Sequence, residues 1–457
     1  MISFRCLARN RNHVFKCISI FLFASLSVFP FFRLNVNRSD GNIWQVGLVW
    51  FALSLAYGLV TFGLVTLAVG KNDRSWLRFL IPASLPFIAA GRARELPGFR
   101  NFGSYGDTLS FFVTDNEDMG RWLLSYAAVR ELFNAVNALL LDIAPLAFVR
   151  MSGSLLMLAW GCWIVSRRES LVTPWLIVLS PIWVLLSVGH DEIYPFVAGL
   201  TMAVSWQVLS GQQIFDRNTS YILAGVLPAL YVGTSPVSLA LIVFTWGHQD
   251  DNYRRIKGLI VAVVSFAVAV EIGGDFKGYF NNLERDLNID GLIRSSEGFL
   301  EDNAIAVTSS GSFLASAAYA FSLLHLLDIV FWLVCGTGLL VLIWVLVDSW
   351  ASDAKRRSLD STESVNTSLL IGLARFVLVA SAVVFFVLML PQLGPTADID
   401  LYFWAMFVVL LLVGTHLDRR LGEHECLQLE SIQLPQLIAL GFAPVTAALV
   451  VFGVARY

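Results

Sequence analysis

An uninterrupted apolar run near the start of the sequence constrains this chain more than any other feature. Ile43–Val69 carries no charged residue, and it is longer than the roughly 20 residues that a helix needs to cross the hydrocarbon core of a bilayer. Within lipid, a segment must satisfy its own backbone N–H and C=O groups, which favours a helix over any open structure. The run therefore predicts a membrane-spanning helix.

Composition extends this prediction to the whole chain. Hydrophobic residues make up 57% of the 457 residues and charged residues only 14%, whereas a soluble domain carries about a quarter charged residues. Many further apolar runs follow the first, separated by polar segments. We therefore expect an all-α, polytopic membrane protein of about thirteen transmembrane helices with two large extracytoplasmic loops.

Charge and cysteine content exclude several kinds of partner and site. The formal net charge is -3 and no basic stripe runs through the sequence, so nucleic acid is not an expected partner. The five cysteines are scattered without a CxxC pair, which indicates neither a disulfide framework nor a zinc site. Membrane lipid is instead the expected surrounding of this chain.

Basic residues indicate the orientation, because cytoplasmic loops are enriched in Lys and Arg. The basic segment Met1–Lys16 overlaps the start of the apolar run Val14–Phe32. We expect this run to be a retained first helix with its amino end in the cytoplasm, since no small-residue cleavage site follows it. Later basic clusters, such as Arg167-Arg168, alternate loops in a consistent way.

The expected organisation follows from these runs. We divide the chain into a two-span extension (1–76), a membrane core (77–348) with external loops at 92–145 and 273–318, a cytoplasmic linker (349–368) and carboxy-terminal spans (369–457). The spans expected after the first two are Leu77–Gly91, Leu146–Val165, Leu171–Val188, Phe196–Leu209, two short spans with a tight turn within Tyr221–Thr245, Gly258–Ile272, Tyr319–Val347, Leu369–Leu390, Leu401–Thr415 and Leu437–Val454. An amphipathic stretch, Trp122–Leu139, is expected either to lie in the interface plane or to pack as an ordinary helix of an extracytoplasmic subdomain.

Carboxylates gather in the loops on one side of this topology. Asp107 lies in a Gly-punctuated turn, Asp191 and Glu192 follow a later span, and Asp398 and Asp400 follow another. Under the expected orientation these loops all open on the extracytoplasmic face. An acid at the edge of a bilayer is costly to bury unpaired, which favours a functional site. The alternatives are that Asp107 and Asp400 cap the helices after them, and that acids simply accumulate outside.

A further polar feature lies inside an apolar run. His325 and Asp328 are three residues apart in Tyr319–Val347, so both lie on one helical face. Ionisable groups within a span usually face a cavity or each other. The two residues therefore indicate either a ligand contact or a His–Asp pair that ties helices together.

The order of these motifs resembles the GT-C superfamily, the multi-span glycosyltransferases that use polyprenyl-phosphate-linked sugars. A catalytic Asp in the first large external loop, amphipathic helices after it and a second acid two spans later are typical of that family. Four stretches of this sequence carry the resemblance: Gly106-Asp107-Thr108, Asp191-Glu192, Ser322–Asp328 and Gly394–Leu401. The last two resemble, more narrowly, bacterial polytopic members of the family. The resemblance covers about Leu77 to Thr415. An extra pair of spans precedes the catalytic loop, and we expect no soluble carboxy-terminal domain of the oligosaccharyltransferase kind.

The resemblance implies an inverting glycosyltransferase that moves a sugar from a polyprenyl-phosphate donor to an acceptor on the outer face of a bacterial inner membrane. Asp107 is the expected general base, and Arg294 with His325 is expected to receive the leaving phosphate. The expected catalytic residues are Asp107, Glu192 and Asp191, and the expected substrate-binding residues are His325, Asp328, Arg294, Asp398 and Asp400. The sequence leaves open the use of a divalent cation, the identity of sugar and acceptor, and the oligomeric state.

Two other classes of function stay open at this point. A transporter or flippase of a lipid-linked or small polar substrate would use acids to couple ions to movement, but such proteins place ionisable groups near the midplane. Here the acids lie at the ends of the expected spans. A non-catalytic GT-C-like subunit is the third reading.

Overall fold

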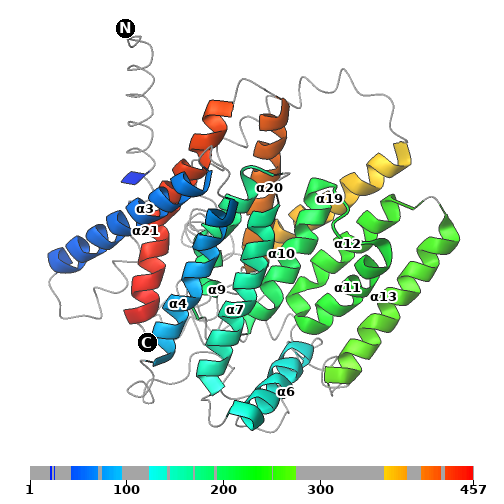
Figure 1. Cartoon of the computed structure of the whole chain (residues 1–457). Helices are drawn as coiled ribbons and strands as arrows, with labels where there is room; N and C mark the ends of the chain where they lie inside the picture. Colours follow the sequence, from blue (N-terminus) through cyan, green and yellow to red (C-terminus); the bar gives the residue numbers. More distant parts are fainter. Residues whose placement is uncertain are drawn as a thin grey trace, which may run out of the picture.

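The computed structural model describes residues 43–69, 75–94, 123–140, 145–167, 170–189, 193–249, 251–273, 365–388, 403–423 and 428–455, together with residues 21, 22 and 25 (Figure 1). Within these ranges every regular element is an α-helix or a short 3-10 helix. The predicted all-α class is therefore confirmed for the part of the chain that is described.

The helices follow the apolar runs of the sequence closely. Their bounds are α3 (Ile43–Val69), η1 (Ser75–Phe79), α4 (Leu80–Arg94), α6 (Leu123–Leu140), α7 (Pro145–Ser166), α8 (Thr173–Val178), α9 (Pro181–Ser187), α10 (Tyr194–Ser210), α11 (Arg217–Leu230), η3 (Val232–Thr234), α12 (Ser235–Gly247), α13 (Asn252–Gly273), α19 (Val365–Leu388), α20 (Phe403–Glu423) and α21 (Gln428–Ala455).

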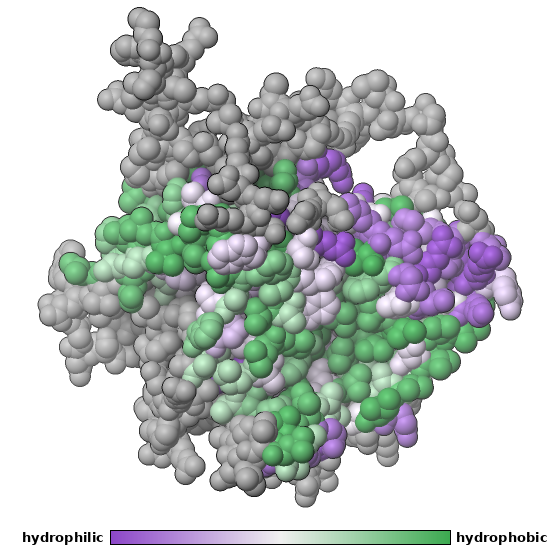
Figure 2. All heavy atoms as spheres, viewed as in Figure 1, coloured by the Kyte–Doolittle hydropathy of each residue, from purple (hydrophilic) through white to green (hydrophobic). Residues whose placement is uncertain are grey.

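Three of the described helices are long and apolar enough to cross a membrane, judged by length and composition. The qualifying stretches are Phe51–Ala68 of α3, Ala147–Ser166 of α7 and Asn252–Gly273 of α13. Large apolar side chains are exposed along α3 and α13. In the view of Figure 2, hydrophobic surface occupies the middle of the molecule, and hydrophilic residues gather near the α12–α13 turn. These features are compatible with a membrane protein. They do not establish the expected count of about thirteen spans.

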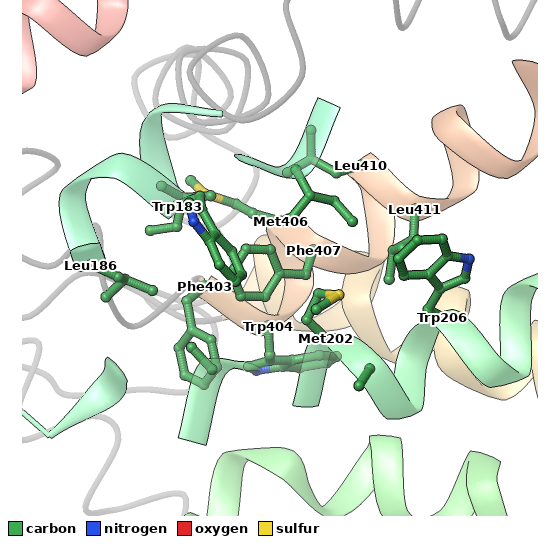
Figure 3. Packing of buried hydrophobic residues seen from close by; sticks show 14 of the residues in the cluster. Trp183, Leu186, Met202, Trp206, Phe403, Trp404, Met406, Phe407, Leu410 and Leu411 are labelled. Atoms are coloured by element: carbon green, nitrogen blue, oxygen red, sulfur yellow. The ribbon is translucent and has the colours of Figure 1, made fainter. Parts of the chain in front are cut away.

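Helix α20 lies at the centre of the described bundle, packed against α8, α10 and α19. Its apolar first three turns, residues 403–413, are buried on nearly every side, as expected for a helix segment inside a bundle. Phe407 packs against Trp183 of α9 with ring centroids 5.9 Å apart (Figure 3). The ring centroid of Trp404 lies 5.1 Å from that of Phe385 in α19. A helix near the carboxyl end of the chain therefore forms the core around which the earlier helices pack.

Small residues let the helices approach closely, as is common where helices associate in lipid. A Cβ atom on Gly225 of α11 would lie 2.2 Å from the carbonyl oxygen of Ala262 in α13. One on Gly258 of α13 would lie equally close to the ring of Tyr221 in α11. The crossing of α11 and α13 therefore depends on the absence of these side chains.

The segment expected to span as Leu171–Val188 is divided into two short helices, α8 and α9. Ser180 is extended (φ -64°, ψ 145°) and its hydroxyl accepts a hydrogen bond from the N–H of Trp183. The following Pro181 lacks an N–H and pushes the residue before it out of the helical region. The stretch expected to span is therefore helical along most of its length but interrupted at Ser180.

Helix α6 lies across one end of the bundle, where it packs on α11 and α13 (Figure 1). It begins at Leu123 and ends at Leu140, which confirms the helix predicted over Trp122–Leu139. Tyr126 and Val129 are buried, whereas Leu132 and Leu139 on the other side are exposed. The helix is thus packed on the bundle through one face and presents apolar side chains on another.

Candidate functional site

The residues predicted to form the site all lie outside the described residues. They are Asp107, Asp191, Glu192, Arg294, His325, Asp328, Asp398 and Asp400. The proposed roles of these side chains therefore remain predictions. The described helices that follow three of the acidic segments nevertheless have a defined arrangement.

Three aromatic rings join the starts of two of these helices. Tyr194 opens α10, Phe403 opens α20, and Tyr231 lies in the turn after α11; we call these three residues the aromatic triad. Ring centroids are 6.0 Å apart for Tyr194 and Tyr231, 5.6 Å for Tyr194 and Phe403, and 6.1 Å for Tyr231 and Phe403. All three are almost fully buried. The amino ends of α10 and α20 are therefore packed together.

A tight turn holds Tyr231 in this position. Its backbone is extended (φ -158°, ψ 122°), which ends α11, and η3 follows at once. The hydroxyl of Thr234 donates to the carbonyl oxygens of Leu227 and Tyr231 at 2.8 and 2.7 Å. The same two carbonyls also accept the backbone N–H groups of Tyr231 and Thr234, so the hydroxyl reinforces a turn that the backbone already closes. The turn predicted within Tyr221–Thr245 is thus present, with a helix on either side.

The start of α6 is tied to the same turn. The hydroxyl of Ser125 donates to the carbonyl oxygen of Leu230 at 2.7 Å, one residue before Tyr231. In the sequence, α6 follows the segment of Asp107, α10 follows Asp191 and Glu192, and α20 follows Asp398 and Asp400. The starts of α6, α10 and α20 accordingly meet around the α11–α12 turn.

A buried arginine lies near this meeting point. Arg150 of α7 is only 4% exposed and is the one charged side chain among the buried residues of the described chain. Ala89 and the backbone of Gly189 pack beside it: a Cβ on Gly189 would lie 3.5 Å from the Cβ of Arg150. One turn further along α7, Gly153 packs on Pro195, the neighbour of Tyr194. Arg150 therefore lies at the end of the bundle that carries the triad.

Arg150 was not among the predicted site residues, although the sequence contains a signal for it. It is a charged residue inside the expected span Leu146–Val165, and charged residues within spans usually face a bundle interior or a cavity. A guanidinium group offers five N–H donors in a planar arrangement that fits phosphate oxygens. It cannot lose its charge at any ordinary pH. Arg150 therefore places a permanent positive charge at this end of the bundle.

The opposite end of the bundle carries a partly buried carboxylate with a structural role. Asp418 of α20 reaches the start of α8, where its Oδ1 accepts from the N–H groups of Leu171 and Val172 at 2.8 and 2.7 Å. Its Oδ2 accepts from the N–H and the hydroxyl of Thr173 at 3.2 and 2.6 Å. Burial raises the pKa of the Asp418 carboxyl, and these hydrogen bonds oppose the rise. Asp418 thus caps α8 across the bundle.

No group of three or more His, Cys, Asp or Glu side chains within the described ranges is arranged to hold a metal ion. The predicted acids lie beyond those ranges. Comparisons with protein-family models, with curated proteins and with solved structures found no match. Function must therefore be argued from the chemistry of the site.

Proposed function

We propose that this chain is an integral-membrane glycosyltransferase of the GT-C type, which transfers a sugar from a polyprenyl-phosphate donor to an acceptor on the extracytoplasmic face. In this proposal the chain has about thirteen spans and lies in a bacterial inner membrane with its amino terminus in the cytoplasm. The donor and the surrounding lipid are its partners. The reaction inverts the configuration at the anomeric carbon.

One observation carries the proposal: the starts of α6, α10 and α20 meet around Tyr231, with the buried Arg150 at the same end of the bundle. Glu192 precedes Tyr194 by two residues and Asp400 precedes Phe403 by three. Because these acids lie so few residues before the packed helix starts, acids from separate loops can serve one substrate in this proposal. A donor phosphate beside these acids needs a cation, which Arg150 supplies.

Each group has a defined task in the proposed reaction. Asp107 removes the proton from the acceptor hydroxyl as the oxygen attacks the anomeric carbon. The bond from that carbon to the donor phosphate breaks, and the polyprenyl phosphate leaves with the bonding electrons. Arg150 stabilises the negative charge that develops on the leaving phosphate. Arg294 and His325 are proposed to assist it.

A transporter is the second candidate, and the division of Leu171–Val188 into α8 and α9 favours it. Transporters place their substrate and ion sites at broken helices near the midplane. In the described structure, however, the break between α8 and α9 is lined by Ile177, Ser180 and Trp183, and no charged side chain lies within α8 or α9. We therefore rank transport below transfer.

The test supplies a labelled polyprenyl-phosphate sugar and candidate acceptors to the purified protein in liposomes. Asp107→Asn removes the base without changing shape and should lower turnover by roughly 10²–10⁴-fold. Arg150→Gln removes the cation and should lower turnover by roughly 10²–10³-fold. Asp216→Asn and Arg254→Gln change exposed residues of the same types at the opposite end of the bundle, so transfer by these controls should equal that of the wild type.

The outcomes separate the candidates. Near-wild-type transfer by Asp107→Asn would reassign the base, with Glu192 next in line. Wild-type protein that transfers no sugar from any donor would refute the enzyme. Movement of lipid-linked sugar between the two leaflets by that same protein would then establish the transporter.

A further inference from the structure

Two arginines flank the carboxyl end of α10, at the end of the bundle opposite the aromatic triad. Arg375 of α19 is half-buried, and its Nε donates to the carbonyl oxygen of Val208 at 3.3 Å. Its Nη2 lies against Gly211, where a Cβ would be 2.7 Å away. Arg419 of α20 is exposed and close enough for its charge to act on that of Arg375. Arg375 therefore lies beside the last turn of α10, with the charge of Arg419 within electrostatic reach of it.

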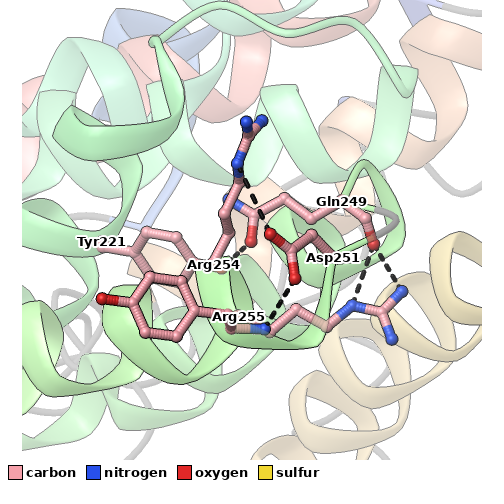
Figure 4. A network of polar contacts seen from close by, with 6 residues as sticks. Tyr221, Gln249, Asp251, Arg254 and Arg255 are labelled. Atoms are coloured by element: carbon pink, nitrogen blue, oxygen red, sulfur yellow. Dashed lines mark hydrogen bonds and ion pairs between the residues drawn. The ribbon is translucent and has the colours of Figure 1, made fainter.

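Two of the described acids at this end of the bundle are engaged with other groups. Asp418, next to Arg419 in sequence, has both carboxylate oxygens at the start of α8. Asp251 lies 3.7 Å from Arg254 in the turn before α13 (Figure 4). Of the described residues, only Val208 accepts a hydrogen bond from Arg375. A guanidinium group has five N–H donors, so Arg375 can bind a second acceptor besides Val208, and Arg419 adds a further positive charge.

The position of Arg375 indicates that the anion comes from lipid. Arg375 lies within the apolar helix α19, between Leu373 and Phe376, which are 44% and 69% exposed. Gly247, the last residue of α12, packs against α19 one turn earlier. The guanidinium group therefore lies where the exposed apolar surface of α19 meets the polar end of the bundle. That boundary is the depth of lipid headgroups.

We propose that Arg375 and Arg419 bind the phosphate of an anionic membrane lipid at the carboxyl end of α10. A phosphate diester presents acceptor oxygens and a negative charge, both of which the two guanidinium groups complement. This end carries the basic residues that we expect in the cytoplasm, where anionic lipids are abundant. The proposal requires that the chain lies in a membrane, but it does not depend on sugar transfer.

The test measures lipid retention by the purified full-length protein. Native mass spectrometry in detergent follows binding of phosphatidylglycerol and, separately, of phosphatidylcholine to the wild type and to Arg375→Gln, Arg419→Gln and the double variant. Each basic residue near an anionic headgroup contributes about fivefold in affinity, so the double variant should bind phosphatidylglycerol roughly thirtyfold more weakly. Arg254→Gln removes an exposed charge at the same end and should bind as the wild type does.

Two results would overturn the site. Equal retention of phosphatidylglycerol by the wild type and the double variant would show that the arginines do not bind it. Displacement of bound phosphatidylglycerol by millimolar inorganic phosphate in the same spectra would show a site for a soluble anion instead of a lipid. Arg419 is exposed, so Arg419→Gln should fold normally and keeps the test decisive if Arg375→Gln does not fold. Sugar transfer is not measured, so failure here leaves the proposed enzyme untouched.

Discussion

Removal of the Asp418 carboxylate should destabilise the contact between α20 and α8. This side chain accepts hydrogen bonds from three backbone N–H groups and one hydroxyl at the start of α8. Asp418→Ala deletes all of these acceptors at once. Gly414, one turn earlier on α20, packs against Thr173 so closely that a Cβ there would lie 2.5 Å from its hydroxyl. The two helices therefore have little freedom to shift and compensate.

The size of this loss of stability depends on how accessible each hydrogen-bond donor is to solvent. Leu171 is 51% exposed, so its N–H can turn to solvent at little cost, but Val172 and Thr173 are fully buried. A buried donor left without a partner costs about 1–3 kcal/mol. The hydroxyl of Thr173 can rotate to a new acceptor, whereas the two buried N–H groups cannot. Asp418→Ala should therefore lower the free energy of unfolding by about 2–6 kcal/mol.

Thermal unfolding of the purified protein in detergent, followed by circular dichroism, measures this loss. Asp251→Ala is the matched control, because Asp251 is exposed and also accepts a hydrogen bond from a backbone N–H, that of Tyr253. Its loss should cost about 1 kcal/mol or less. An Asp418→Ala variant as stable as Asp251→Ala would refute the reasoning, since the carboxylate would then contribute nothing beyond an exposed contact.

Two further predictions concern packing. Gly225→Ala should destabilise the protein by about 1–3 kcal/mol, because the new Cβ would meet the Ala262 carbonyl. Gly63→Ala is the control, since a Cβ there meets nothing within 4 Å, and it should not destabilise the protein. Equal unfolding temperatures of the two variants would contradict the close crossing of α11 and α13. Tyr231→Ala should destabilise by about 3–5 kcal/mol and abolish transfer by separating the starts of α10 and α20. Tyr231→Phe keeps the ring and should be destabilised less than Tyr231→Ala, whereas an active Tyr231→Ala would show that the triad does not organise the site.

Much of the secondary structure could be predicted from sequence, because apolar runs that lack charge have few alternatives to a helix. Helix α3 covers the predicted Ile43–Val69 without change, and α7 and α6 follow their predicted stretches within a few residues. The turn after Tyr231 was visible in the polar Gly233-Thr234 step. These features depend on neighbours in the sequence, so local composition was sufficient.

The division of α8 from α9 was also encoded locally but is not visible to hydropathy. Pro181 interrupts the hydrogen-bonding ladder without lowering the apolar character of the segment. A window that averages over hydrophobicity joins the two helices, whereas the backbone chemistry of a single residue separates them.

What only the tertiary structure decided is which helices lie together. Asp418 and Thr173 are 245 positions apart, and Ser125 and Leu230 are 105 apart. No local pattern specifies such pairs, because they depend on how the buried faces of several helices fit at once. The position of Arg150 was decided in the same way. In the sequence it is one charge in an apolar run, and only the packing of helices places it beside Gly189, at the end of the bundle that carries Tyr194. Helices follow from local chemistry, but a site requires side chains that are distant in sequence to be brought within reach of one ligand.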